Sequence, residues 1–97
     1  MPTTLVYDVP PSYRHNGYIY IKGDDRHLFP QPGTIVDLLL GDSNEPVEGR
    51  VRMESNNRLR IYGLRQWFAS LGERRGLTIE IISVLPLKSY RIRPVGW

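Results

Sequence analysis

The sequence has 97 residues, enough for one domain with a modest hydrophobic core and too few for two. The absence of cysteine excludes a disulfide framework and thiolate metal ligands. The apolar runs are only a few residues long, and neither a signal peptide nor a transmembrane run is visible. We therefore expect a cytoplasmic protein without a membrane partner, with residues 1–97 folded as a single domain.

The charged residues divide the chain into an acidic and a basic half. Residues 1–49 carry three basic and seven acidic side chains, a net charge of −4, whereas residues 50–97 carry ten basic and three acidic ones, a net charge of +7. Eleven of the thirteen basic residues are arginine, whose planar guanidinium suits phosphates and guanine edges. This asymmetry favours a polyanionic partner, although a basic half can also be ordinary solvated surface.

The first half of the chain is predicted to be rich in strands. Alternating apolar residues predict strands over 3–9, 18–22 and 34–40. Residues 10–17, with the sequence PPSYRHNG, are expected to form a polar turn or loop. Residues 24–29 are expected to form one helical turn, with Asp24 as its N-cap and Pro30 as its stop. Residues 41–46 consist of turn formers and predict a loop.

Residues 47–62 predict a β-hairpin with one apolar and one charged face. Val51 and Met53 alternate with arginines on the first arm, and Leu59 and Ile61 do so on the second. Because a shift of one residue would turn every apolar side chain to water, burial fixes the register of such a pair. A three-residue loop over 55–57 keeps the apolar residues opposite one another.

The same register places Arg52 opposite Arg60 and Glu54 opposite Arg58 on the charged face. The second pair is favourable, whereas like charges directly opposite destabilise a hairpin. The first pair therefore suggests an anion held between the two arginines, and phosphate fits the guanidinium fork best. The alternative is an exposed hairpin whose arginines are only solvated, and the hairpin alone does not decide between them.

After the hairpin the apolar period changes from two to that of a helix. Apolar residues at i, i+3, i+4 and i+7 predict an amphipathic helix over 64–71, and Gly72 follows where a C-cap belongs. This stripe is expected to be core rather than a ligand-stacking surface: Leu64, Trp67, Phe68 and Leu71. Residues 77–84 and 88–95 predict the last two strands, with Tyr90 facing inward.

The sequence contains no recognisable catalytic constellation. It has no glycine-rich phosphate loop, and neither His15 nor His27 has metal-ligand spacing or a nucleophile beside it. The acidic residues are expected to cap a helix or to be solvated. We therefore expect no enzymatic activity in this domain, no metal site and no cofactor.

Three segments together resemble one DNA-binding architecture: NGYIYIKGDDRHLFP (16–30), RLRIYGLRQWFASLGERRGLTIEI (58–81) and SYRIRP (89–94). In order they look like a strand and short helix, then a strand, aromatic helix and strand, then a closing strand of the B3-like domains. That family includes plant B3 transcription factors and, more similar to this chain, DNA-recognition domains of bacterial restriction endonucleases. The resemblance covers most of the chain, about Thr3 to Pro94. It implies a mainly β fold, a seven-stranded open pseudobarrel with two short α-helices.

The family grips duplex DNA with two arms that enter the major groove. The resemblance places the N-terminal arm on the loop with residues Ser12, Tyr13, Arg14, His15 and Asn16. It places the C-terminal arm on the hairpin, with Arg52, Glu54, Ser55, Asn56, Asn57, Arg58 and Arg60. The resemblance implies sequence-specific double-stranded DNA as the partner. It also implies a separate nuclease domain or subunit, so the chain would be a fragment of a larger protein.

Side-chain chemistry suggests different roles within these arms. Arginine can bind guanine bidentately and asparagine can bind adenine, so Asn56, Asn57 and Arg58 are candidate base readers, with Glu54 orienting Arg58 or accepting from cytosine. One of the asparagines can equally be turn chemistry, and Tyr13 can equally pack. Positions expected to contact phosphates or to lie on the surface are Arg50, Lys88, Arg91 and Arg93.

Two other functions remain open at this stage. Tyr18 and Tyr20 share one face of a strand, so a small barrel that stacks single-stranded nucleic acid or RNA is compatible with the sequence. Competition between duplex and single-stranded oligonucleotides distinguishes this alternative. A protein-interaction barrel without nucleic-acid binding is the other alternative, and it predicts no response to salt or DNA.

Overall fold

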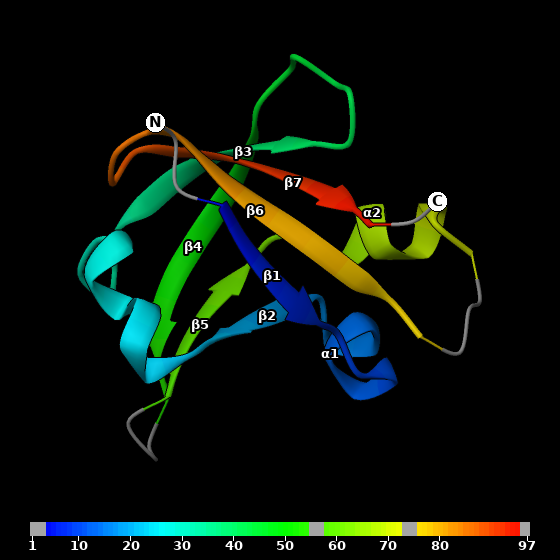
Figure 1. The fold of residues 1–97 in the computed structure, drawn as a ribbon, viewed down its shortest axis with the longest axis horizontal. Coiled ribbons are helices and arrows are strands. Elements are labelled where there is room, and N and C mark those ends of the chain that lie inside the picture. Colours follow the sequence, from blue (N-terminus) through cyan, green and yellow to red (C-terminus); the bar gives the residue numbers. More distant parts are fainter. Residues whose placement is uncertain (1–3, 55–57, 73–75, 96–97) are drawn as a thin grey trace.

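Residues 4–54, 58–72 and 76–95 are described by the computed structural model drawn in Figure 1. Seven strands form one sheet: β1 (Thr4–Asp8), β2 (Tyr18–Ile21), β3 (Ile35–Leu40), β4 (Val47–Met53), β5 (Leu59–Tyr62), β6 (Thr78–Leu85) and β7 (Ser89–Pro94). Three short helical segments connect them: α1 (Pro11–Asn16), the 3-10 helix η1 (Gly23–Leu28) and α2 (Arg65–Ser70). The strands follow the predicted ones closely.

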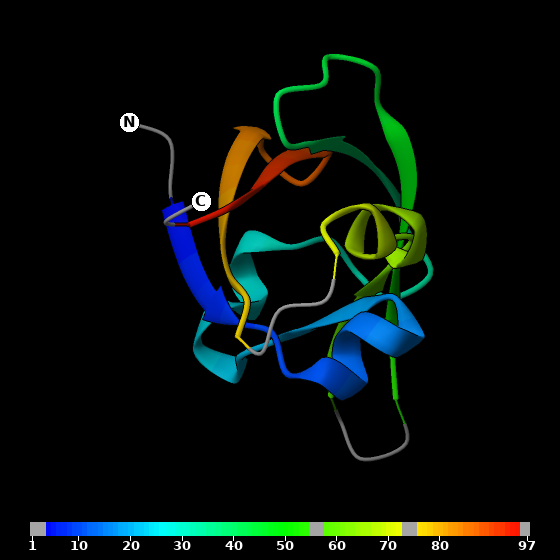
Figure 2. The same cartoon turned by 90° about the vertical axis from the view of Figure 1, so that its right-hand side faces the viewer.

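The strands are ordered β1-β6-β7-β3-β4-β5-β2 across the sheet. Neighbouring strands are antiparallel, except for β3 and β7, which run parallel. The sheet does not lie flat but curls round the core into an open barrel, as the two views in Figures 1 and 2 show. The predicted fold class, a mainly β and seven-stranded open barrel with short helices, is confirmed.

The core fills the inside of the curl because alternate residues of every strand point inward. Its members on strands β2 to β7 are Ile19, Ile21, Val36, Leu38, Val51, Leu59, Ile61, Ile79, Ile81, Tyr90 and Ile92. Two tyrosine hydroxyls attach η1 to this core. Tyr7 donates a hydrogen bond of 2.6 Å to Asp25 Oδ2, and Tyr90 donates one of 2.8 Å to the Leu28 carbonyl.

The prediction of a loop over residues 10–17 is wrong, because residues Pro11–Asn16 form α1. Pro11 lies at the first helical position, where a missing N–H costs nothing and the fixed φ favours a helix. Gly17 ends the helix in the left-handed conformation, at φ 76°, and its N–H donates to the Tyr13 carbonyl. Both signals were present in the sequence, in the order that marks a short helix.

The other two helical segments lie where they were predicted, with two differences. η1 is a 3-10 helix whose N-cap is Lys22 rather than Asp24, and no side chain caps it. In α2, Phe68 is buried, whereas Trp67 is half-buried and packs against the core. Leu64, the residue before the helix, is also buried. Leu71 is also half-buried there and is the C-cap of α2, so Gly72, at φ 78°, lies one residue beyond the C-cap rather than at it.

Candidate nucleic-acid interface

The β4–β5 hairpin has the predicted register. Val51 pairs with Ile61 and Arg52 pairs with Arg60, and the Glu54 N–H donates to the Arg58 carbonyl at 2.8 Å. The apolar face is buried as expected, except at Met53. That side chain is 38% exposed, because it lies at the end of β4.

Cross-strand pairing places the outward side chains of four strands in rows. In one row Tyr18, Tyr62, Arg50 and Ile35 follow one another across β2, β5, β4 and β3. In the next row Tyr20, Arg60 and Arg52 follow one another across β2, β5 and β4. We call a group of six residues from these rows and beside them the arginine–tyrosine face, in which Tyr18 is itself buried beneath its neighbours: Tyr18, Tyr20, Arg52, Arg58, Arg60 and Tyr62.

Tyrosine rings offset the repulsion between the two opposed arginines. The guanidinium of Arg60 lies 4.2 Å from the centroid of the Tyr18 ring, and that of Arg52 lies 5.5 Å from the Tyr62 ring. Such contacts are worth about 0.5–1 kcal/mol each where they are exposed. The Arg52–Arg60 pair is therefore accommodated within the chain, and an external anion is not needed to explain it.

The carboxylate of Glu54 pairs with Arg60 and not with Arg58, so the predicted Glu54–Arg58 side-chain pair is wrong. The Tyr62 hydroxyl donates to Glu54 Oε1 at 2.6 Å and accepts from Arg60 Nη1 at 3.2 Å. Arg60 Nη1 also lies 3.7 Å from Glu54 Oε1. The hydrogen bond from Arg60 to Tyr62 raises the pKa of the guanidinium. These long side chains lean along the hairpin, so their partners are not the residues directly opposite them on the other strand.

Arg58 instead lies 4.9 Å over the ring of Tyr20 and remains exposed to solvent. Its orientation thus comes from an aromatic ring on β2. The three other predicted readers of this arm, Ser55, Asn56 and Asn57, lie outside the described residues.

The predicted N-terminal arm is helix α1, and its side chains divide between packing and exposure. Tyr13 packs against the core and lies 4.9 Å from the Tyr18 ring and 6.2 Å from the Tyr20 ring. The Asn16 amide donates to the Ser12 carbonyl at 2.9 Å, which occupies one of its donors within the helix. Ser12, His15 and Asn16 are exposed, whereas Arg14 is half-buried.

Helix α1 is fixed in place by a close approach to α2. The Leu64 N–H donates to the Gly17 carbonyl at 3.2 Å, and a Cβ on Gly17 would lie only 2.6 Å from the Cβ of Arg65. The helix therefore adjoins the Tyr18–Tyr62 end of β2 and β5, whereas the residues that lead into the hairpin loop lie at their other end. Strands β2 and β5, which carry four of the six residues of the arginine–tyrosine face, run side by side from the α1 end of the sheet (Figure 1).

Sequence reasoning missed the partners of the arginines and misplaced one arginine. The sequence did contain a signal for these ring contacts, because Tyr18 and Tyr20 share a face of β2 and Tyr62 shares a face with Arg60. Joining the two observations would have predicted arginines packed on tyrosine rings. Arg91 was expected at a phosphate or on the surface. It instead donates to the carbonyls of Gly41 and Ser43 and to Asn44 Oδ1, at 2.8, 3.1 and 2.9 Å, so it holds the loop after β3.

The described ranges contain neither a candidate metal site nor a candidate membrane-spanning helix. No group of three or more histidine, aspartate or glutamate side chains lies close enough together there to hold a metal ion. No helix in these ranges is both long and apolar enough to span a membrane.

Comparison with known proteins shows likeness in structure but not in sequence. No protein-family model matches the sequence, and no curated protein matches it. The N-terminal domain of Helicobacter pylori LlaJI.R1 superposes with a TM-score of 0.75 at 15% identity, covering 98% of this chain and 81% of that one. FUS3 from Arabidopsis, in a complex with DNA, superposes with a TM-score of 0.70 at 13% identity, covering 93% of each chain.

A third solved structure, a hypothetical protein of Arabidopsis thaliana, has a TM-score of 0.63 at 16% identity and covers 97% of this chain and 92% of that one. These identities are too low to transfer a function, but the superpositions cover nearly the whole chain. The protein thus has the B3-like pseudobarrel fold that the three sequence segments predicted.

Proposed function

We propose that the chain binds double-stranded DNA in a sequence-specific manner, with α1 and the β4–β5 hairpin entering the major groove. The observation that carries the proposal is the arginine–tyrosine face. Three guanidiniums lie over three tyrosine rings there, and positioning them before binding reduces the entropy lost when DNA is bound. FUS3, which has the same fold, is found in a complex with DNA.

Within this proposal the residues have different tasks. Arg58 is exposed, lies next to the hairpin loop and is oriented by Tyr20, so we assign it to a base edge, with guanine as the preferred base. Arg52 and Arg60 lie further from the loop and provide positive charge for phosphates. From the other arm, Ser12 and His15 are exposed donors. Ser55, Asn56 and Asn57 remain predicted readers.

The wider context is part of the proposal. The resemblance to DNA-recognition domains of restriction endonucleases implies that cleavage would be carried out by another domain or subunit. In that arrangement the present chain selects the DNA site and contributes no catalytic group.

Selection of duplexes from a pool with a randomised central segment tests the proposal, with binding repeated at two salt concentrations. Enrichment of a defined site that binds more weakly at the higher salt is the expected result. Recovery of no common site, or binding that does not depend on salt, would contradict it.

Single-stranded nucleic acid is the alternative, and the contacts of the tyrosines speak against it. Bases stack on free aromatic faces, whereas the ring of Tyr18 is covered by Arg60 and that of Tyr20 by Arg58, with Tyr13 beside both. A single strand that competes as well as the selected duplex would favour the alternative.

A further inference from the structure

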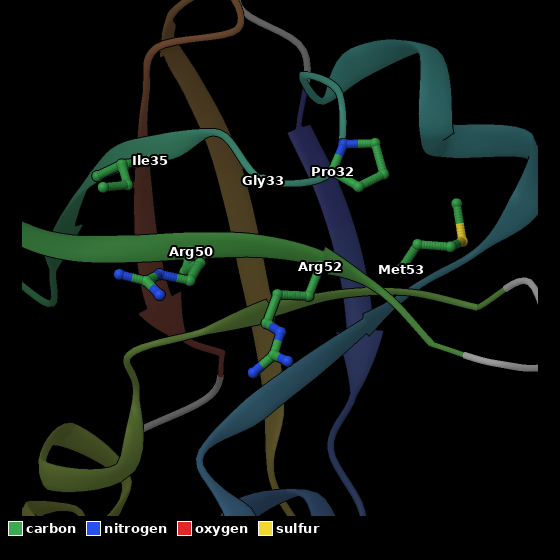
Figure 3. A pocket seen from close by; sticks show the side chains of 6 residues that line it. All are labelled: Pro32, Gly33, Ile35, Arg50, Arg52 and Met53. Carbon is green, nitrogen blue, oxygen red and sulfur yellow. The ribbon is translucent and has the colours of Figure 1, made fainter.

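A hollow of about 560 Å³ lies beside the arginine–tyrosine face, on β4 and the segment that leads into β3. Its lining residues are Pro32, Gly33, Ile35, Arg50, Arg52 and Met53, and Figure 3 shows both arginine side chains projecting from the same side of β4.

Two cations line this hollow. Arg50 and Arg52 are two positions apart on β4, so both face outward, and both are exposed. Arg50 has no hydrogen-bond or ion-pair partner among residues 4–54, 58–72 and 76–95. Arg52 contacts the Tyr62 ring with its guanidinium, which leaves its N–H groups available to an acceptor. The hollow is therefore suited to an anion.

The remaining walls are apolar and held in place. Ile35 is 52% exposed and Met53 is 38% exposed, and Pro32 also lines the hollow. The Gly33 N–H donates to the Val51 carbonyl at 2.7 Å, so this segment is attached to β4 and the hollow exists before any ligand arrives. A ligand that joins an anionic group to an apolar one matches both parts of the lining.

We propose that this hollow binds one backbone phosphate of duplex DNA with its deoxyribose, outside the base pairs that the two arms contact. The inference rests on the proposed function and extends it. Arg50 and Arg52 would bind the phosphate, while the sugar would pack on Ile35. The hollow is continuous with the arginine–tyrosine face, because Arg50 pairs with Tyr62 and Arg52 with Arg60 across β4 and β5. This continuity favours a phosphate of a bound polymer over a free nucleotide.

The test uses the selected duplex trimmed by one base pair at a time from each end, with affinity measured by fluorescence anisotropy over a range of salt concentrations. For the unsubstituted protein, one trimming step on one side should reduce the steepness of the salt dependence by about 0.9, the value for one phosphate contact. Arg50→Ala leaves Arg52 in place, so it should bind the long duplex with a shallower slope than the unsubstituted protein and should respond less to the same trimming step. Lys22→Ala, which removes one exposed charge outside this lining, should retain the step.

An Arg50→Ala protein that keeps both the full slope and the trimming step would overturn the inference. A second result would also overturn it. If the unsubstituted protein binds thymidine monophosphate, Arg50→Ala does not, and the two proteins have equal salt slopes with DNA, then the hollow is a free-nucleotide site. In either case the duplex would still bind with a salt dependence. Failure of the unsubstituted protein to bind any duplex would instead contradict the proposed function itself.

Discussion

The guanidinium of Arg60 donates to the hydroxyl of Tyr62 at 3.2 Å, and that hydroxyl donates in turn to Glu54. The three side chains come from both arms of the hairpin and share its outward face. Together with the Tyr18 ring beneath Arg60, they allow two opposed arginines to lie side by side without a bound anion. The face is therefore positioned before any ligand binds.

Tyr62→Phe should remove this connection while keeping the ring beneath Arg52. Glu54 and Arg60 would each lose a hydrogen-bond partner at a half-exposed site, and we expect the free energy of unfolding to fall by about 1 kcal/mol. Duplex affinity should also fall, since Arg60 would be less well oriented. The matched control is Tyr20→Phe, because the contacts of Tyr20 involve its ring. Equal losses in the two variants, in denaturant titrations and duplex binding, would contradict the proposed connection.

Arg58→Ala should relax base preference at one position of the selected site. A good bidentate contact is worth about 1–3 kcal/mol of discrimination, and the effect should appear on a panel of duplexes with single base-pair changes. Because Tyr20 rather than Glu54 orients Arg58, Tyr20→Leu should reproduce part of the loss. A uniform fall in affinity across the panel would assign Arg58 to the phosphates.

Gly17→Ala should displace or destabilise the helical arm. Its φ of 76° is unfavourable for alanine, and the added Cβ would lie within 2.9 Å of the Arg65 backbone. We expect a loss of about 1–3 kcal/mol in stability and a lower duplex affinity. Gly23→Ala is the control, since Gly23 has neither a positive φ nor a neighbour within 4 Å of the added atom. A Gly17→Ala protein as stable as this control would show that the close approach of α1 and α2 is not required.

Alkaline pH should lower the free energy of unfolding through the buried tyrosines. Burial raises the pKa of Tyr90 to about 12 and also raises that of Tyr7. A raised folded-state pKa favours the protonated folded form, so this stability is complete below the ordinary tyrosine value of about 10. It should be lost as the pH rises from about 10 towards 12. Denaturant titrations at successive pH values measure the loss, and Tyr90→Phe should have a flatter profile over that range.

The sequence predicted where the seven strands lie along the chain and the hairpin register, because both depend on apolar alternation, which burial enforces. It did not predict α1, because residues 10–17 are polar and therefore indicate a loop, although Pro11 and Gly17 are typical of the first residue and the end of a short helix. Nor did it predict how Glu54 and Arg91 are used. Their partners, Tyr62 and the carbonyls of the loop after β3, depend on how long side chains lean and on which distant segments meet. Cross-strand opposition defines which residues share a row but does not define these contacts.

The dependence of duplex affinity on salt concentration tests DNA binding by the arginine–tyrosine face most directly. Each phosphate that a cationic side chain neutralises contributes roughly −0.9 to the slope of log affinity against log salt. We expect a slope of roughly −2 or steeper for the unsubstituted protein, and a shallower one for a protein with both Arg52→Ala and Arg60→Ala. A flat response in the unsubstituted protein, or equal slopes in the two proteins, would contradict DNA binding by this face.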